Sequence, residues 1–176
     1  MTSRTVRYVI RLARLDDFAV LPGIELAAGR LFAEAGLDDV ADNPPVSTEF
    51  IESFARAGAA HVAVDNDDIP VGFALSAPLD TQGHLYELSV HPDHGRRGLG
   101  KRLVDAACGV AYARGAHAMT LATFRDLAWN GPFYERLGFR ELQFHEWTPA
   151  LHVLHAREID LELPVDRRCF MRKELR

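Results

Sequence analysis

The chain has 176 residues, of which 48% are hydrophobic and 26% charged, a composition typical of a globular protein with a full core. We therefore expect one domain over residues 1–176. No apolar run approaches the roughly 20 residues of a membrane-spanning helix, and no apolar signal segment opens the chain. The two cysteines do not suggest a disulfide framework, and Cys108 fits a buried free thiol. We expect a cytoplasmic protein without a membrane partner.

Charge is distributed unevenly along the chain. The net charge of -5 argues against nucleic acid as a partner. Residues 1–82 carry 6 basic and 13 acidic side chains, whereas residues 83–176 carry 14 basic and 12 acidic ones. Part of the basic surplus lies at residues 96–102. An anion bound there, with a cationic partner at the acidic half, would fit this distribution, and so would ordinary surface charge.

The first third of the chain predicts one strand and two helices. Residues 6–12 alternate loosely and indicate a strand. A helix over 18–35 follows and ends at Gly36. Residues 37–46 are expected to form a loop long enough to bind a ligand. Ser47 or Thr48 then opens a second helix that reaches about residue 57.

Strands dominate the middle of the chain. Residues 61–64 and 71–75 indicate two strands joined by a hairpin turn at 66–68. The next strand covers 83–90, and a helix covers 99–114 and stops at Gly115.

The last third alternates strands and helices. Residues 118–124 form a strand with alternating side chains, and a short helix covers 133–137. We expect a strand over 139–144, a helix over 149–159 and a closing strand over 166–172. The strand-helix-strand unit implies a parallel strand pair, whereas the hairpins imply antiparallel pairs. The fold class is therefore α/β with a mixed sheet and helices on its faces.

A strand, a glycine turn and a helix follow one another at residues 87–104. The first amides of such a helix lack internal partners and point outward, and the helix dipole adds positive charge at that end. Glycines at 95, 98 and 100 let a ligand approach the backbone closely. Phosphate is the usual ligand of such a turn. The Gly-Lys-Ser/Thr ending of a nucleotide triphosphate loop and the dinucleotide fingerprint are both absent.

Two motifs resemble those of the GNAT-type N-acetyltransferases. The segment 90–92, Val-His-Pro, and the segment 98–100, Gly-Leu-Gly, match the acyl-coenzyme A binding motif. Gly95 departs from it, because the family places Arg or Gln there, and Arg96 or Arg97 could supply the displaced charge. The segment 130–139, Asn-Gly-Pro-Phe-Tyr-Glu-Arg-Leu-Gly-Phe, is similar to the second signature. Together with the element order, the resemblance covers nearly the whole chain.

The resemblance implies a fold and a cosubstrate. The fold would be a mostly antiparallel sheet with a parallel, splayed central strand pair and helices on both faces. Acetyl-CoA would be the cosubstrate, and no metal is implied, since His91, Asp93 and His94 lack a convincing further ligand. The charged side chains could instead be solvated, and Asn130 could be a helix cap. The implied coenzyme-binding residues are Leu88, Ser89, Val90, Arg96, Arg97, Gly98, Gly100, Lys101, Arg102 and Asn130.

The resemblance also implies a direct attack of an acceptor amine on the thioester. Glu87 is the candidate base, with a substrate-binding or structural carboxylate as the alternative. Tyr134 matches the family tyrosine that protonates the departing thiolate, with a core aromatic as the alternative. His84 and Tyr86 are weaker candidates for the base, acting through a water.

The acceptor is expected near the N-terminal helices, where Glu25, Asp38 and Asp39 could hold a cationic amine. It could be a small molecule or a protein amine, and a homodimer stays open because exposed edge strands often pair. We expect an acetyltransferase. The alternatives are an acyltransferase for longer chains and a non-catalytic acyl-CoA sensor on the same fold.

Overall fold

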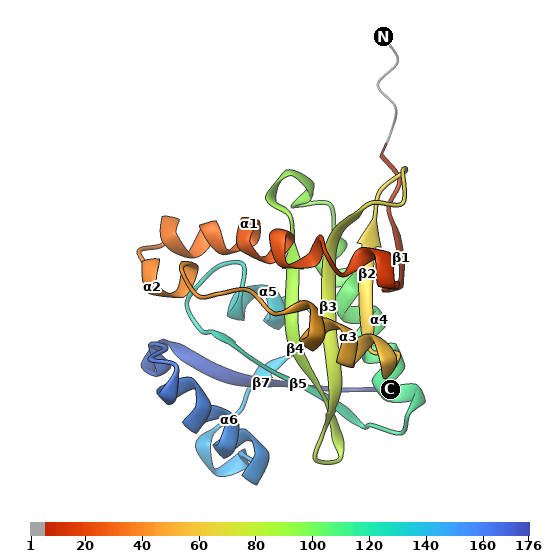
Figure 1. Cartoon of the computed structure of the whole chain (residues 1–176). Coiled ribbons are helices and arrows are strands. Elements are labelled where there is room, and N and C mark those ends of the chain that lie inside the picture. The colour runs from red at the N-terminus through yellow and green to blue at the C-terminus, as the bar shows by residue number, and fades with distance from the viewer. Residues whose placement is uncertain (1–5) are drawn as a thin grey trace. The chain divides into compact units, whose positions relative to one another are not determined.

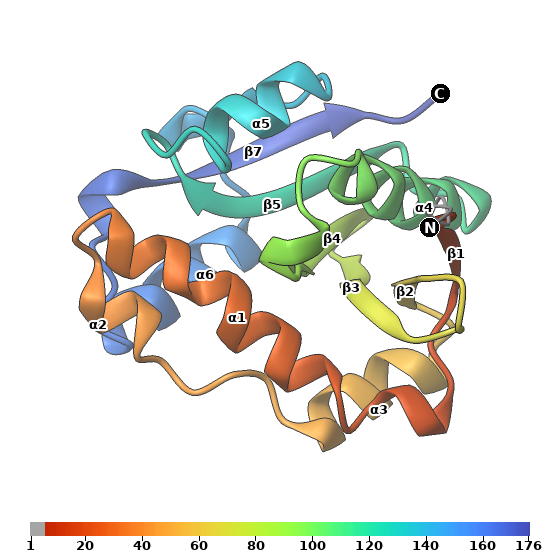
Figure 2. The same cartoon turned by 90° about the horizontal axis from the view of Figure 1, so that it is seen from above.

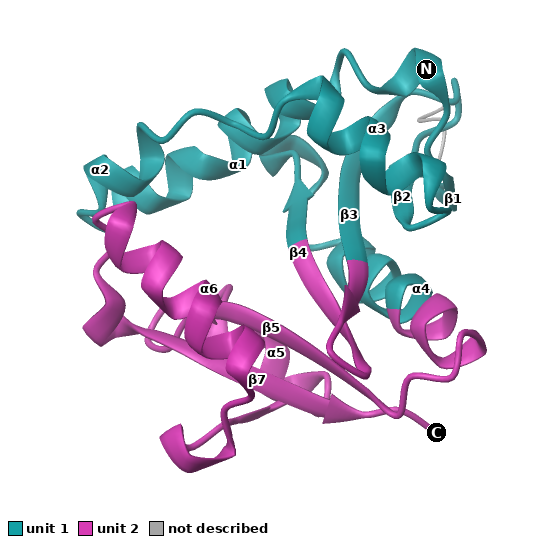
Figure 3. Ribbon diagram, turned by 60° about the horizontal axis from the view of Figure 1, so that its bottom comes forward, with its two compact units in different colours: residues 1–76, 87–107 teal, residues 77–86, 108–176 magenta. Residues whose placement is uncertain are grey.

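Residues 6–176 are described by a computed structural model. They fall into two compact units, one of residues 1–76 and 87–107 and one of residues 77–86 and 108–176 (Figure 3). Strand β4 (Gln82–Val90) belongs to both units, with its first half in the second unit and its last four residues in the first. The expectation of one domain stays a prediction.

The described elements form a mixed α/β arrangement (Figure 1). The hydrogen-bonded order of the strands is β1-β2-β3-β4-β5-β7-β6. The strands besides β4 are β1 (Val9–Leu12), β2 (Ala60–Val64), β3 (Pro70–Leu79), β5 (Ala118–Phe124), β6 (Arg140–Glu141) and β7 (Arg168–Glu174). The helices are α1 (Leu21–Glu34), α2 (Asp38–Ala41), α3 (Thr48–Arg56), α4 (Leu99–Ala113), α5 (Gly131–Arg136) and α6 (Pro149–Asp160).

The sheet mixes both strand directions, as the sequence predicts. Strand β2 pairs antiparallel with β1 and β3, and β7 pairs antiparallel with β5 and β6. Strand β4 pairs parallel with β5, residues 83–85 against residues 119–121. This pairing confirms the parallel pair inferred from the strand-helix-strand unit. The splaying of that pair stays a prediction.

The first unit combines β1, β2, most of β3 and the end of β4 with the helices α1 to α3 and the first part of α4. Strand β2 is buried along its whole length, and Leu21, Ile51 and Phe73 of the same unit are fully buried. The Ser47 hydroxyl accepts a hydrogen bond from the Phe50 amide at 3.1 Å, which caps α3 as predicted. Helices α1 and α2 lie side by side (Figure 2).

The second unit is organised on β5 and β7, which pair over seven positions. Leu142, Leu151 and Phe170 form a buried cluster against which the Trp147 ring packs edge-on, 4.8 Å from the Phe170 ring. Both cysteines are buried and lie outside any disulfide of the described residues, as expected for Cys108.

Two predicted segments are wrong in part. The expected loop over 37–46 contains α2, since the Val40 and Ala41 amides donate to the Leu37 carbonyl and close a helical turn. The expected strand over 139–144 shrinks to β6, because Phe144–Glu146 forms a 3-10 turn. The Glu146 carboxylate accepts the Gln143 amide at 2.8 Å and stabilises that turn.

The edges of the first two elements also shift. Strand β1 begins at Val9 rather than at residue 6, and α1 begins at Leu21 rather than at residue 18. Between them, Leu15–Asp17 forms a 3-10 turn whose Asp17 carboxylate accepts the Arg14 amide at 2.7 Å. That local hydrogen bond occupies the Asp17 carboxylate before α1 starts.

Among residues 6–176, no helix combines the length and the apolar character that crossing a bilayer requires.

Close approach of β3 to the end of β4 requires glycine at position 72. A Cβ there would lie 3.0 Å from the Ser89 carbonyl oxygen and 3.1 Å from the Val90 Cγ2 atom. We predict that Gly72→Ala lowers the free energy of unfolding by about 1–3 kcal/mol, because the backbone of β4 must move. Denaturant unfolding would measure it.

The matched control is Gly109→Ala on the exposed side of α4, where a Cβ meets nothing within 4 Å. That change should leave stability unchanged or raise it by up to about 1 kcal/mol. Equal effects of the two changes would contradict the packing assigned to Gly72.

Candidate functional site

The turn between β4 and α4 has the backbone of an anion-binding site. Arg96 and Gly98 adopt left-handed conformations, with φ of 58° and 75°. Helix α4 starts at Leu99, and the Arg102 amide donates to the Gly98 carbonyl at 3.2 Å. The amides of Leu99, Gly100 and residue 101 precede that first helical bond and have no acceptor in the helix. This arrangement favours a phosphate or diphosphate.

Two of the four predicted cations are hydrogen-bonded to Tyr8. The Arg97 Nη1 donates to the Tyr8 hydroxyl at 2.9 Å, and its Nη2 lies 3.5 Å from the Asp93 carbonyl oxygen. The Arg102 Nη2 donates to the Tyr8 carbonyl at 3.0 Å. These guanidinium groups are therefore engaged within the first unit, which the sequence pattern did not predict.

The other two cations differ from one another. The Lys101 ammonium pairs with the Asp105 carboxylate one turn along α4. Within the described residues, the exposed Arg96 side chain has no ion pair or hydrogen bond recorded. Arg96 is thus the predicted cation best placed to meet an anion at the turn.

Gly95 has an ordinary backbone conformation in a crowded place. Its φ of -63° and ψ of 166° are extended values open to any residue. A Cβ at this position would lie 3.1 Å from the Pro92 carbonyl oxygen, which also accepts the Gly95 amide at 3.0 Å. The tight turn over Pro92 explains why glycine fits where the motif has Arg or Gln.

Glu87 lies near the end of β4. The residue as a whole is half-buried, whereas its carboxyl group is strongly desolvated. The Ser89 hydroxyl donates to its Oε1 at 2.8 Å. Burial, and then the nearby charge of Glu25, raise the pKa of Glu87 to about 7, against the opposing effects of the Ser89 and Leu88 hydrogen bonds. No ion pair of Glu87 is recorded among residues 6–176.

Glu25 is the second carboxylate of this region and comes from α1. The Val46 amide, in the segment before α3, donates to its Oε2 at 2.9 Å. Burial raises the pKa of Glu25, and the Val46 hydrogen bond opposes the rise. Glu25 and Glu87 therefore form a pair of interacting carboxylates within one unit.

The other predicted acidic residues come from a different helix. Asp38 and Asp39 are exposed on α2. Leu88 and Val90 are half-buried on β4, and Ser89 is buried.

Two predicted residues belong to the second unit. Asn130 precedes α5, but its side chain does not cap the helix: its Oδ1 accepts the Thr123 hydroxyl at 2.6 Å. Tyr134 is 8% exposed and packs edge-on against Phe133 and Phe139, with ring centroids 5.0 and 5.6 Å away. The aromatic packing fits the alternative of a core residue and leaves the hydroxyl chemistry untested.

The weaker candidates for a base, His84 and Tyr86, belong to the second unit. His84 is 3% exposed, its Nδ1 lies 2.8 Å from the Thr120 hydroxyl, and burial lowers its pKa to about 4. Burial raises the pKa of Tyr86. His84 is therefore too weak a base near pH 7, and the Tyr86 hydroxyl keeps its proton there, so neither group is suited to accept a proton from an amine.

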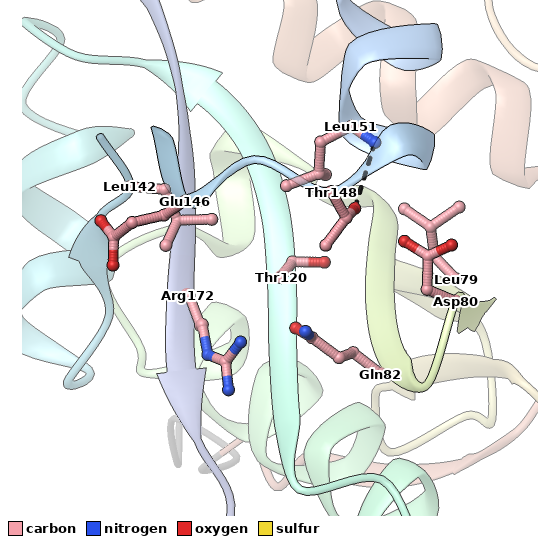
Figure 4. Close-up of a pocket in the computed structure, with 9 residues that line it drawn as sticks. All are labelled: Leu79, Asp80, Gln82, Thr120, Leu142, Glu146, Thr148, Leu151 and Arg172. Atoms are coloured by element: carbon pink, nitrogen blue, oxygen red, sulfur yellow. Dashed lines mark hydrogen bonds between the residues drawn. The ribbon is translucent and has the colours of Figure 1, made fainter. Parts of the chain in front are cut away.

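A small hollow also lies in the second unit (Figure 4). It holds no predicted site residue. Gln82 and Arg172 approach it from two strands, and the buried Gln82 Oε1 atom has no hydrogen-bond partner in the described part of the chain. Its lining is Leu79, Asp80, Gln82, Thr120, Leu142, Glu146, Thr148, Leu151 and Arg172. Across residues 6–176, no group of three or more His, Cys, Asp or Glu side chains is arranged to hold a metal ion.

Comparisons with known proteins find acetyltransferases, as the two motifs predict. A Bacillus subtilis (strain 168) protein named as an acetyltransferase is 29% identical over 121 residues, which cover 68% of this chain and 80% of that protein. The crystal structure of a GNAT family acetyltransferase from Staphylococcus aureus Mu50 matches 97% of this chain and all of its own, with a TM-score of 0.71 and 19% identity.

The PaiA N-acetyltransferase of Thermoplasma acidophilum, solved in complex with coenzyme A, matches 96% of this chain and 99% of its own, with a TM-score of 0.68 and 15% identity. At such identities, the likeness establishes the fold. The profile of the Acetyltransferase (GNAT) family matches residues 29–139, which span both the glycine turn and the second motif. The resemblance read from those two motifs is thereby confirmed, and the chain belongs to the GNAT acetyltransferase family.

Proposed function

We propose that this chain is an N-acetyltransferase that moves the acetyl group of acetyl-CoA to a primary amine by direct attack on the thioester. Family membership supports acetyl transfer in general. The observation that carries the finer proposal is the Glu87 carboxylate, which is desolvated, has a pKa near 7 and lies near the end of the strand that leads into the anion-binding turn.

Glu87 has the properties of a general base for this reaction. An alkylamine is protonated at neutral pH and must lose a proton before its nitrogen can attack a carbonyl carbon. A base works best when its pKa lies near the operating pH, because it is then both deprotonated and strong enough to accept the proton. The Ser89 hydroxyl, 2.8 Å from Oε1, orients the carboxylate.

The turn after β4 would hold the coenzyme. The amides at the start of α4 and the Arg96 guanidinium suit a diphosphate, and Gly98 and Gly100 let it approach the backbone. Arg97, Lys101 and Arg102, which are engaged by Tyr8 and Asp105, would support the turn around it, and Asn130 would contact the coenzyme as the motif implies. The pantetheine arm would add along Leu88, Ser89 and Val90 as an extra strand does. Acetyl-CoA supplies the acetyl group as an activated thioester.

The chain's own groups balance the reaction. Glu87 takes the proton of the ammonium, the amine nitrogen forms a bond to the acetyl carbon, and the carbon–sulfur bond breaks. The Val90 amide would stabilise the negative charge on the acetyl oxygen. The Tyr134 hydroxyl would protonate the departing thiolate, and the second proton that the nitrogen loses on becoming an amide would return to the Tyr134 oxygen. Tyr134 and Asn130 belong to a different unit from Glu87, and their roles rest on the motif.

The acceptor would be a small-molecule or protein amine. Glu25 and Glu87 lack ion pairs in the described part of the chain and interact unfavourably with one another. A cationic amine would relieve that repulsion, since half-buried charges are stable when paired. The exposed Asp38 and Asp39 would add attraction at longer range.

Replacing the base should abolish most turnover. We predict that Glu87→Gln lowers kcat/KM about 10²- to 10⁴-fold with CoA affinity near that of the wild type. Release of free thiol during a screen of small amines, amino acids and peptides with acetyl-CoA would measure the rate, and calorimetry the affinity. Glu34→Gln, an exposed position on α1, is the matched control.

The same screen tests the function itself. A wild-type chain that binds CoA tightly but acetylates no amine would favour the non-catalytic sensor. Faster turnover with longer acyl-CoA donors would favour the broader acyltransferase. A Glu87→Gln variant as active as the wild type would remove Glu87 from the role of base.

Removing the charge of Glu25 should move the pH profile of the reaction. With Glu87 as base, kcat/KM rises with pH through the pKa of Glu87, near 7. Because the negative charge of Glu25 raises that pKa, we predict that Glu25→Gln shifts the midpoint of the rise to lower pH. A pH series of initial rates measures the midpoint, and an unchanged midpoint would show that the two carboxylates do not interact.

Tyr134→Phe should separate chemistry from packing. It keeps the ring that contacts Phe133 and Phe139 and removes only the hydroxyl. We predict that kcat falls about tenfold to a hundredfold while CoA affinity stays near normal, because the proton donor is lost. Tyr112→Phe, on the exposed side of α4, is the control. Full activity of Tyr134→Phe would leave Tyr134 as a core aromatic.

A further inference from the structure

Tyr8 contacts both ends of the glycine turn, although it lies nearly ninety residues away in the sequence. Its hydroxyl lies 2.9 Å from the His94 Nδ1 atom and accepts a hydrogen bond from Arg97 Nη1 at 2.9 Å. Its main-chain carbonyl accepts a hydrogen bond from Arg102 Nη2 at 3.0 Å. One residue before β1 is thus bonded to side chains on either side of Gly95–Gly100.

The hydrogen bonds of the Tyr8 hydroxyl follow from the chemistry of its partners. Arginine can only donate, so the hydroxyl oxygen accepts from Arg97 and keeps its own proton for another acceptor. Neutral His94 with its proton on Nε2 offers that acceptor at Nδ1. The rings add contacts, because the Arg97 Cζ lies 5.8 Å from the Tyr8 centroid and the His94 ring meets Tyr8 edge-on at 5.8 Å.

The bonded side chains enclose a segment whose backbone needs support. Between His94 and Arg102, Arg96 and Gly98 have positive φ values of 58° and 75°. A left-handed conformation is unfavourable for arginine and persists only where the surroundings hold it. Among the described residues, the main-chain hydrogen bonds at this turn are those of His94 to His91 at 2.9 Å, Gly95 to Pro92 at 3.0 Å and Arg102 to Gly98 at 3.2 Å, and none of the three involves Arg96.

We propose that Tyr8 is a positioning residue that presets the turn for a diphosphate. It fixes Arg97 and Arg102 from outside, so that Arg96 and the first amides of α4 are left to face the ligand. The same contacts hold the turn where the motif residue at position 95 is missing. The proposal rests on the proposed function, because it takes the diphosphate of coenzyme A as the ligand.

The test compares Tyr8→Phe with Tyr112→Phe, both in the full chain. Tyr8→Phe keeps the ring but loses both hydrogen bonds of the hydroxyl. The first measurement is amide hydrogen exchange in the ligand-free protein. We expect exchange at His94 and Gly95 to become several-fold faster in Tyr8→Phe and to be unchanged in Tyr112→Phe.

The second measurement compares two ligands, CoA and pantetheine, which lacks the diphosphate. We expect Tyr8→Phe to weaken CoA binding about tenfold, as the loss of hydrogen bonds to a charged group does, and to leave pantetheine binding unchanged. A uniform loss for both ligands, or unchanged exchange with unchanged CoA affinity, would overturn the role of Tyr8.

A double-mutant cycle guards against a general effect on folding. In the Arg97→Met background, Tyr8→Phe should cost CoA affinity much less than in the wild type, since its charged partner is already gone. An equal cost in both backgrounds would overturn the proposal. A wild-type chain that binds no CoA would overturn the proposed function as well, whereas CoA bound equally by wild type and Tyr8→Phe overturns only the role of Tyr8.

Discussion

A desolvated carboxylate that has no ion pair among residues 6–176 is the constraint on which the site depends. Glu87 keeps its proton up to about pH 7 in the folded chain, far above the ordinary pKa of a glutamate. Between pH 4.5 and 7 the folded state therefore binds more protons at this site than the unfolded state. The contribution of Glu87 to folding stability falls as pH rises through that window. The rest of the fold supports this unfavourable group, and the burial that makes it costly also gives it the pKa that the proposed role as a base requires.

Several local features keep Glu87 in place. Gly72 lets β3 approach the end of β4, because any Cβ at position 72 would press on the Ser89 carbonyl oxygen. The Ser89 hydroxyl bonds the Glu87 carboxylate, and the Val46 amide bonds Glu25, which in turn interacts with Glu87. The segment between α2 and α3 thus influences a group on β4 by way of α1. A change in any of these contacts is expected to move the pKa of Glu87 before it unfolds the chain.

Sequence reasoning succeeded where the signal is local. The alternation of side chains predicted β5 at 118–124, and Ser47 was one of the two residues predicted to start α3. The glycine turn and the second motif indicated the family. It failed where a short polar contact decides the outcome, as at α2 and at the turn closed by Glu146. It could not find Tyr8, whose bonds to Arg97 and Arg102 join residues nearly ninety positions apart, and no local pattern encodes such a contact.

The basic residues around the turn show why counting charges overstates a binding site. Four cations cluster there in the sequence, but Arg97 and Arg102 are bonded to Tyr8 and Lys101 to Asp105. An incoming diphosphate would have to break or share those bonds to use them. Attraction at the turn then depends on Arg96 and on the oriented amides of α4, which lose little on binding because the fold already fixes them. The engaged arginines contribute by holding that backbone in place.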